Sequence, residues 1–173
     1  SPKLLLRLVI AGIISTALAL ATETIGSGIL DRVFYEENTT YDVLMYFIVV
    51  ACSEEGFKYL VLKKATWKNR EFNCTFDGVV YAVFVSLGFA LWENIKYVAI
   101  YGMGTAMVRA VTAVPGHAAF GVFMGVWYGM AKKAELKGRK PQCKNCQRMA
   151  LLMPILVHGA YDFVATQSSG VGD

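Results

Sequence analysis

The chain has 173 residues, a length that suits one compact domain. Hydrophobic residues make up 55% of the chain and charged residues only 17%, whereas soluble domains carry about 25% charged residues. With a formal net charge of +4 and four cysteines, this composition excludes a disordered tail, a small disulfide scaffold and a binder of nucleic acid through a basic patch. The composition predicts a membrane protein.

Five apolar stretches approach the roughly 20 residues that a helix needs to span a bilayer. They are residues 4–21, 43–62, 78–101, 106–131 and 149–166. A soluble core helix is rarely apolar on every face for so long. Arg7 interrupts the first stretch, which argues against a signal peptide. The sequence therefore predicts an all-α fold: one polytopic bundle of transmembrane helices, with five spans, forming a single domain over residues 1–173.

The charges of the connectors predict the orientation of the bundle. The first connector is acidic, with Asp31, Glu36 and Glu37 against Arg32, and the third is uncharged. The second and fourth connectors are basic and, together with Lys3, hold twelve of the 17 lysines and arginines. By the positive-inside rule, these basic connectors and the N-terminus face the cytoplasm. We expect an integral protein of a bacterial cytoplasmic membrane, in contact with lipids and with no nucleic-acid partner.

Polar residues inside the predicted spans indicate function, because a charge at the centre of a spanning helix costs at least ~2.5–3.5 kcal/mol on insertion scales. Four of the five stretches carry them. They are Glu54, Glu55 and Lys58 in the second, Glu93, Asn94 and Lys96 in the third, Arg109 and His117 in the fourth, and His158 and Asp162 in the fifth.

These polar residues are expected to lie at a common depth. At 1.5 Å per residue, Glu54 and His117 lie roughly 16 Å from the outer ends of their helices. Glu93 and His158 lie roughly 12 Å from theirs by the same measure. Hydropathy alone does not require this agreement. It predicts one shared site on the outer side of the membrane midplane.

Position within each helix refines this prediction. Glu54 and Glu55 point about 100° apart, so we expect one to face the site and the other to bond to Lys58 or a neighbouring helix. Taken alone, Lys58 is as compatible with a purely structural Glu–Lys ion pair as with a role in the site. Arg109 is close enough to the end of its stretch to extend outward to the interface. Pro115 removes a backbone hydrogen bond just before His117, which predicts a kink there.

The cysteines give a weaker signal. Cys143 and Cys146 form a C-x-x-C pair in the fourth connector, which is half of a zinc ribbon and needs two more ligands. Cys74, in the other basic connector, is one candidate for a third ligand. We expect the pair to be incidental or a minor loop staple.

The polar motifs, taken in chain order, resemble those of PrsW-type intramembrane peptidases, which are relatives of the CAAX prenyl endopeptidase and bacteriocin-processing superfamily. The motifs are EExxK from Glu54 to Lys58, FxxxEN from Phe89 to Asn94, a Pro-x-His segment at His117 with Arg109 upstream, and HxxxD from His158 to Asp162. The last motif ends in aspartate, where prenyl endopeptidases usually have asparagine. The HExxH pattern of ordinary zincins is absent.

The resemblance implies peptide-bond hydrolysis within or beside the membrane. PrsW-type proteins are site-1 proteases that cut a membrane-anchored anti-sigma factor on its outer side, so a membrane-anchored protein is the implied substrate. The candidate catalytic residues are Glu54, Glu55, Glu93, His117 and His158. The candidate supporting residues are Lys58, Asn94, Arg109 and Asp162.

Two mechanisms fit these residues. In the first, Glu54 or Glu55 is a general base that acts on water, and His117 or His158 stabilises the oxyanion. In the second, His117, His158 and Glu54 or Glu93 bind Zn²⁺, since two histidines and a carboxylate are a known catalytic zinc set. The sequence leaves open whether the cofactor is zinc or none. We slightly favour the first mechanism, because no single helix has a compact metal-ligand spacing.

Two other classes of protein remain as alternatives. A proton- or ion-coupled transporter would use the same buried Glu, Lys and His residues as a relay, but such carriers often show inverted repeats, and none is evident here. The other alternative is a non-catalytic membrane scaffold. The sequence predicts no oligomeric state.

Overall fold

The computed structural model describes residues 1–36 and 38–169, and these residues form helices with no strand among them. Glu37, one acid of the first connector, lies outside the described residues. The elements are α1 (Pro2–Val33), α2 (Thr39–Val43), the π-helical segment η1 (Leu44–Ala51), α3 (Cys52–Thr66), α4 (Thr75–Tyr101), α5 (Met103–Val111), α6 (Ala113–Leu136) and α7 (Lys140–Ser169).

Among the described residues, four helical stretches are long and apolar enough to cross a membrane: Pro2–Val33, Thr75–Tyr101, Met107–Leu136 and Lys140–Gln167. The remaining predicted span, residues 43–62, is helical from the end of α2 through η1 into α3. Glu54, Glu55 and Lys58 make it less apolar than the other four. The predicted all-α membrane bundle is confirmed, and the chain is an integral membrane protein.

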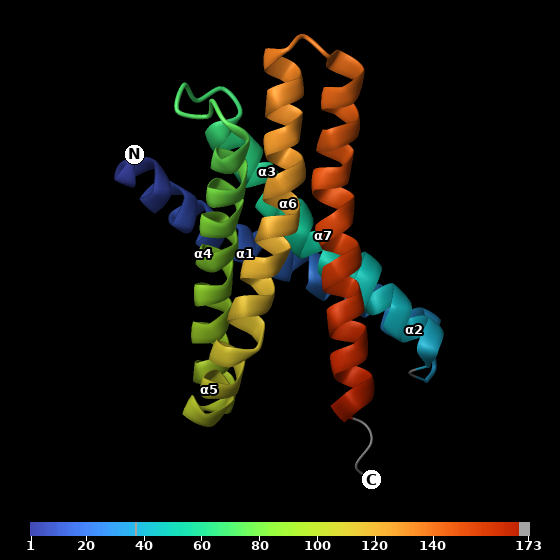
Figure 1. Ribbon diagram of the computed structural model, residues 1–173. Coiled ribbons are helices and arrows are strands. Elements are labelled where there is room, and N and C mark those ends of the chain that lie inside the picture. The colour runs from blue at the N-terminus through green and yellow to red at the C-terminus, as the bar shows by residue number, and fades with distance from the viewer. Residues whose placement is uncertain (37, 170–173) are drawn as a thin grey trace.

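The helices are arranged as an upright group with two elements crossing it (Figure 1). α4, α6 and α7 run roughly side by side, and α6 packs against both of the others. α1 and the continuous rod of α2, η1 and α3 cross this group obliquely, with α1 packed on α4 and η1 packed on α7. The α6–α7 turn and the loop between α3 and α4 lie at one end, so the two basic connectors share a side of the bundle.

Glycines allow α4 and α6 to pack closely. A Cβ atom on Gly129 would lie 2.1 Å from the carbonyl oxygen of Thr75, and one on Gly125 would lie 2.4 Å from the Cα of Val79. Gly78 of α4 lies in the same interface, and we call these three residues, Gly78, Gly125 and Gly129, the glycine seam. Small residues four apart let backbones approach in this way, and the close packing replaces the hydrophobic driving force that lipid does not supply.

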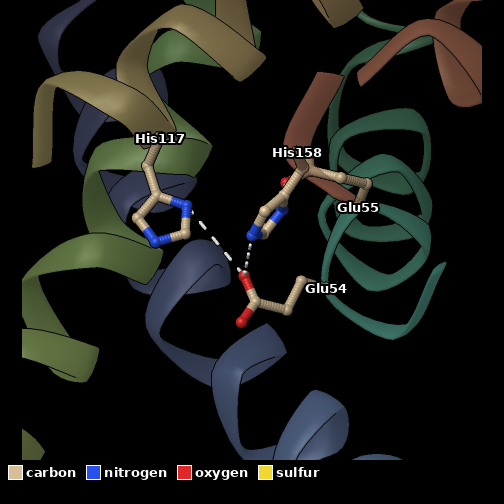
Figure 2. A group of neighbouring side chains, drawn as sticks. All are labelled: Glu54, Glu55, His117 and His158. Atoms are coloured by element: carbon tan, nitrogen blue, oxygen red, sulfur yellow. Dashed lines mark hydrogen bonds and ion pairs between the residues drawn. The ribbon is translucent and has the colours of Figure 1, made fainter. Parts of the chain in front are cut away.

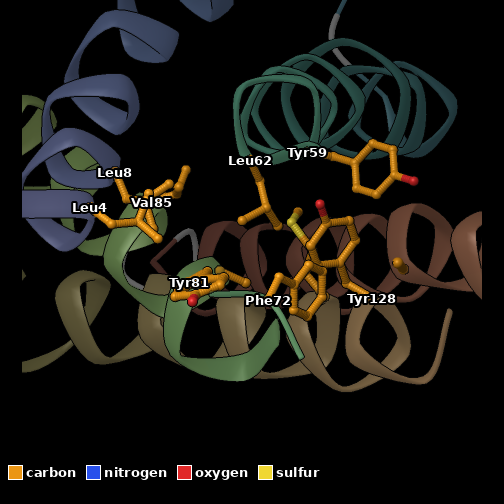
Figure 3. Close-up of a cluster of buried hydrophobic side chains, with 11 residues drawn as sticks. Leu4, Leu8, Tyr59, Leu62, Phe72, Tyr81, Val85 and Tyr128 are labelled. Carbon is orange, nitrogen blue, oxygen red and sulfur yellow. The ribbon is translucent and has the colours of Figure 1, made fainter. Parts of the chain in front are cut away.

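An aromatic cluster fills the space between the seam and α3 (Figure 3). Phe72 stacks on Tyr128 with ring centroids 5.1 Å apart, and Tyr81 meets Phe72 edge-on at 5.6 Å. The hydroxyl of Tyr128 lies 2.8 Å from that of Thr66 on α3, so its polar end is satisfied inside the core. This cluster fixes α3 against α4 and α6 on the side of the basic connectors.

The helical chain is broken twice between α4 and α6. Gly102 has φ +84°, a conformation that favours glycine, and it ends α4. The second break is at Thr112, five residues before His117, so Pro115 lies in the first turn of α6 instead of interrupting a helix beside His117. Between the two breaks, α5 exposes four large apolar side chains: Met103, Met107, Val108 and Val111.

Two helix ends differ most from the prediction. α1 continues from the predicted end at residue 21 to Val33, and within this extension the hydroxyls of Thr22, Thr24 and Ser27 donate to carbonyls of the preceding helical turn. α7 begins at Lys140 instead of residue 149. Cys143 and Cys146 therefore lie in a helix and not in a loop.

The close packing at the glycine seam can be tested with a matched pair of substitutions. We expect Gly129→Ala to lower the melting temperature, since its Cβ meets backbone that cannot move aside, at a cost of about 1–3 kcal/mol for overpacking. The control is Gly28→Ala on α1, where a Cβ meets nothing within 4 Å. Thermal unfolding in detergent, followed by tryptophan fluorescence, gives both values. Equal melting temperatures for the two variants would contradict the close packing of α4 and α6 at the glycine seam.

Candidate active site

Polar side chains from four helical elements meet in one buried cluster. α3 contributes Glu54, Glu55 and Lys58, and all three are at most 4% exposed. α4, α6 and α7 contribute Glu93, His117 and His158, which are 9%, 5% and 3% exposed. The predicted meeting of these residues at one level of the bundle is confirmed by the structure, although their catalytic roles stay a prediction.

The Lys58 ammonium lies at the centre of the cluster. Its Nζ donates to Glu55 Oε1 at 2.7 Å and to Glu54 Oε2 at 3.3 Å. It lies 3.0 Å from His117 Nδ1, and it stands 4.0 Å from the centroid of the Phe89 ring. Each of its three protons therefore has an acceptor. Lys58 places one positive charge between two adjacent carboxylates that lipid would otherwise strongly disfavour.

The hydrogen bonds of His117 determine which of its nitrogens carries the proton. An ammonium can only donate, so Nδ1 of His117 accepts from Lys58. Nε2 then carries the proton and donates it to Glu93 Oε2 at 2.9 Å. His117 is thereby fixed between a cation and a carboxylate, with its ring orientation set by two helices besides its own.

Carboxylates flank His158 on both ring nitrogens. Nδ1 lies 2.8 Å from Glu55 Oε1, and Nε2 lies 3.1 Å from Asp162 Oδ2, one helical turn along α7. A carboxylate only accepts, so these contacts favour the doubly protonated, cationic imidazole. Phe120 stacks on the ring, with centroids 4.5 Å apart, and holds its plane. Asp162 thus lies where a supporting residue for His158 was predicted.

Arg109 points inward. Its guanidinium donates to Glu93 Oε2 at 2.8 Å and to Asn94 Oδ1 at 3.2 Å, and it covers the Tyr97 ring at 3.7 Å. The expectation that it extends outward to the interface is wrong, because the charge of Glu93 and the Tyr97 face offer better partners. Asn94 and Arg109 both lie next to the cluster, as predicted for supporting residues.

A cavity of about 440 Å³ opens onto the cluster. Glu54, Glu93, His117 and His158 line it, whereas Glu55 does not. Figure 2 shows the Glu54 carboxylate between the two imidazoles, with Oε2 4.0 Å from His117 Nδ1 and 3.9 Å from His158 Nε2. The expected division of the acidic pair is therefore present: Glu54 faces the cavity, and Glu55 bonds to Lys58 and His158.

Four of these residues form a group that could hold a metal ion. Glu54, Glu55, His117 and His158 each offer a ligand atom, and these atoms lie within 4.8 Å of one another. Glu93 is outside the group, since it lies on the far side of the His117 ring. One carboxylate oxygen, Glu55 Oε2, is buried and has no hydrogen-bond partner among the described residues.

The cysteines form no comparable group within the described part of the chain. Cys143 and Cys146 are buried against Ala131 and Ala134, and Cys74 is exposed at the start of α4. No metal-binding set of three or more ligands contains them among the residues that the structure places. The third-ligand role suggested for Cys74 is not supported.

Two charged residues of the cavity were missed or left without a role by the sequence analysis. Glu23 of α1 lines the cavity. It was missed because the first span was predicted to end at residue 21, two residues before it. Lys96 of α4 also lines the cavity. The length of α1 was the missing information, because a helix that continues to Val33 carries Glu23 inside the bundle.

Comparison with known proteins gives the family. The model of the PrsW family of intramembrane metalloproteases matches residues 1–172. The chain belongs to this family. Among curated relatives, it is 37% identical to "Protease PrsW" of Clostridioides difficile over 130 residues, 72% of this chain and 53% of the relative. It is 39% identical to "Protease PrsW" of Bacillus subtilis over 116 residues, 67% of this chain and 51% of the relative.

A third relative, "Protease PrsW" of Oceanobacillus iheyensis, is 40% identical over 118 residues, 68% of this chain and 53% of the relative. The chain spans about half the length of the curated PrsW proteins that it matches. No solved structure matches it. Membership of the PrsW family favours the peptidase prediction over the transporter and scaffold alternatives.

The central position of Lys58 can be tested by removing its charge. We expect Lys58→Met to destabilise the fold by about 3–5 kcal/mol, because two buried carboxylates lose their cation. Unfolding by titration with sodium dodecyl sulfate, followed by circular dichroism, measures this loss. Lys96→Met is the matched control, since Lys96 forms no ion pair with a described residue.

The double variant Glu55→Gln/Lys58→Met separates charge from packing. It should recover part of the lost stability, since one unpaired charge disappears with the cation. If Lys58→Met unfolds at the same detergent concentration as Lys96→Met, Lys58 does not hold the cluster together.

Proposed function

We propose that this chain hydrolyses peptide bonds of a membrane-anchored protein at the cavity lined by Glu54, His117 and His158. The observation that supports this most directly is the position of Glu54, whose carboxylate faces the cavity between two imidazoles. A base and a cationic hydrogen-bond donor beside the same space are the groups that peptide hydrolysis needs. Family membership supports the same activity.

Glu54 is the residue best placed to take a proton from water. It faces the cavity, and its partner Lys58 holds it in one orientation from the protein side. Glu55, in contrast, is bonded to Lys58 and His158 and lies away from the cavity. For the metal-independent mechanism, we therefore assign the role of proton acceptor to Glu54 and a positioning role to Glu55.

His158 is the residue best placed to stabilise the negative charge of the tetrahedral intermediate. Its two carboxylate neighbours favour the cationic ring, and the ring lines the cavity. A fixed cation in a site with little water is worth more to a developing oxyanion than it would be in solvent. Asp162 and Glu55 hold the ring in place for this purpose.

The family is described as a metalloprotease, and the donor set fits zinc by its chemistry. His117, His158 and Glu54 would hold the ion, and Glu93 would then orient His117 from its far side. When bound, zinc supplies a hydroxide at neutral pH and polarises the carbonyl. Glu55 Oε2, which accepts no hydrogen bond from the described residues, has lone pairs that a cation at this cluster could use.

Two hydrogen bonds oppose metal binding in the arrangement that the structure shows. Lys58 uses the lone pair of His117 Nδ1, and Asp162 faces Nε2 of His158. Binding of zinc therefore requires that Lys58 release His117 and that His158 lose a proton. This competition predicts a metal affinity that depends on pH and on Lys58.

The substrate we propose is a membrane-anchored protein, such as an anti-sigma factor, cut near the predicted outer side of the membrane. The cavity is lined by the second half of α4 and the first half of α6, at the end away from the basic connectors. The relation to the CAAX prenyl endopeptidase superfamily stays a prediction from the order of the motifs.

The activity can be tested with reconstituted protein. A mixture of synthetic single-span peptides is incorporated with the protein into liposomes, and cleavage products are identified by mass spectrometry. We expect Glu54→Gln to lower the rate by about 100-fold or more, because general-base catalysis contributes 10²–10⁴-fold, while the melting temperature changes little. Glu36→Gln, on the exposed segment after α1, is the control. Full cleavage by a folded Glu54→Gln variant would contradict the assignment.

The metal can be tested independently of activity. We expect purified protein to contain about one zinc ion per chain by elemental mass spectrometry, and His117→Ala and Glu54→Gln to contain far less. Occupancy should fall as the pH is lowered, because protons compete for the same ligands. Glu36→Gln should keep its zinc. If the wild type cleaves peptides without bound metal, Glu54 acts on water directly.

A further inference from the structure

One carboxylate of the cavity has a buried oxygen without a hydrogen-bond partner among the described residues. Glu23, on α1, lines the cavity together with Glu54 and Glu93. Its Oε1 atom is buried and accepts no hydrogen bond from the described residues, whereas the threonines beside it bond to their own helix. A buried acceptor without a donor is expensive in a protein, and more so at membrane depth.

The other acids of the cavity are already paired. Glu93 bonds to Arg109 and His117, Glu54 bonds to Lys58, and Asp162 contacts His158. Lys96 lines the same cavity, but it forms no ion pair within 4.0 Å with Glu23 or with any other described acid. Glu23 therefore has hydrogen-bonding capacity that remains available to a ligand in the cavity.

We propose that Glu23 binds the substrate, accepting a hydrogen bond from an N–H group of the peptide that is cleaved. This inference rests on the proposed function, since it assumes that a peptide enters the cavity. The donor is either the side chain of a lysine or arginine of the substrate or a backbone amide of its unwound segment. Glu23 is a specificity residue in this proposal, and the bond-breaking step needs no contribution from it.

The chemistry of a membrane substrate supports this role. A helix that unwinds for cleavage exposes backbone N–H groups, and at membrane depth there is too little water to satisfy them. An acceptor supplied by the enzyme compensates for part of that cost, and a charged acceptor forms a stronger hydrogen bond than a neutral one. Glu23 adds such an acceptor from α1, a helix that contributes none of the predicted catalytic residues.

The test uses the 173-residue chain in liposomes of phosphatidylethanolamine and phosphatidylglycerol. The probes are synthetic single-span peptides that differ by one lysine, placed in turn at each position around the mapped cleavage site, with methionine in its place in the control series. For wild type, Glu23→Ala, Glu23→Gln and Glu36→Gln, kcat and KM are measured separately. Peptide affinity is measured in the Glu54→Gln background, where cleavage does not interfere.

We expect Glu23→Ala to raise KM and to weaken peptide affinity by about tenfold to a hundredfold, as for a lost hydrogen bond to a charged group, with a smaller change in kcat. If the donor is a side chain, wild type prefers one lysine peptide and Glu23→Gln loses that preference. If the donor is a backbone amide, Glu23→Gln keeps most of the affinity for every peptide. Glu36→Gln should match wild type.

Two outcomes would overturn the inference. One is unchanged KM and affinity in Glu23→Ala for every peptide. The other is a loss of melting temperature in Glu23→Ala, matched by Lys96→Met, with unchanged affinity, which would make Glu23 a structural partner of Lys96. Failure of the proposed function gives a different result: peptides bind in a manner that depends on Glu23, and wild type cleaves none of them.

Discussion

The contact between Lys58 and the two carboxylates before it determines what the rest of this bundle can do. A pair of adjacent glutamates in a membrane helix is untenable unless a cation is supplied within the protein. Lys58 supplies it from one turn further along the same helix and uses its last proton on His117 of α6. The acids and both imidazoles, from α3, α4, α6 and α7, are therefore parts of one hydrogen-bonded unit.

This unit lies in a bundle with two unlike halves. Towards the basic connectors, glycines and stacked aromatic rings bring α3, α4 and α6 into close contact. Towards the other end, the interruption at Thr112 and the turn at Gly102 separate the backbones, and the cavity opens there. Tight packing at one end and space at the other allow a polar cavity to exist without loosening the whole fold.

The residues of the cluster could be predicted from the sequence because burying a charge in lipid is so costly that charged residues inside spans have few possible places other than a shared polar site. Glu54, Glu93, His117 and His158 were placed at one depth by counting residues, and they do meet. The direction of Arg109 was not predictable in this way, since a partner on another helix, Glu93, decides it.

Helix ends were the weakest part of the sequence reasoning. α1 continues past the predicted end of its apolar stretch to Val33, so Glu23 was not recognised. The π-helical segment η1 was also not predictable, because its apolar residues fit either kind of helix. A π-helical turn is often found beside a functional site, and here it directly precedes Cys52, Ser53 and the acidic pair.

The short helix α5 has a consequence for how the surroundings influence the site. Its exposed apolar face has hydrocarbon as its natural neighbour, whereas Arg109, from the same helix, reaches in to Glu93. The side chain that steadies Glu93 is thus carried by a short helix that packs on α4 and α6 and exposes an apolar face to its surroundings. A change at that exposed face can reach the surroundings of His117 through Arg109 and Glu93, without any ligand entering the cavity.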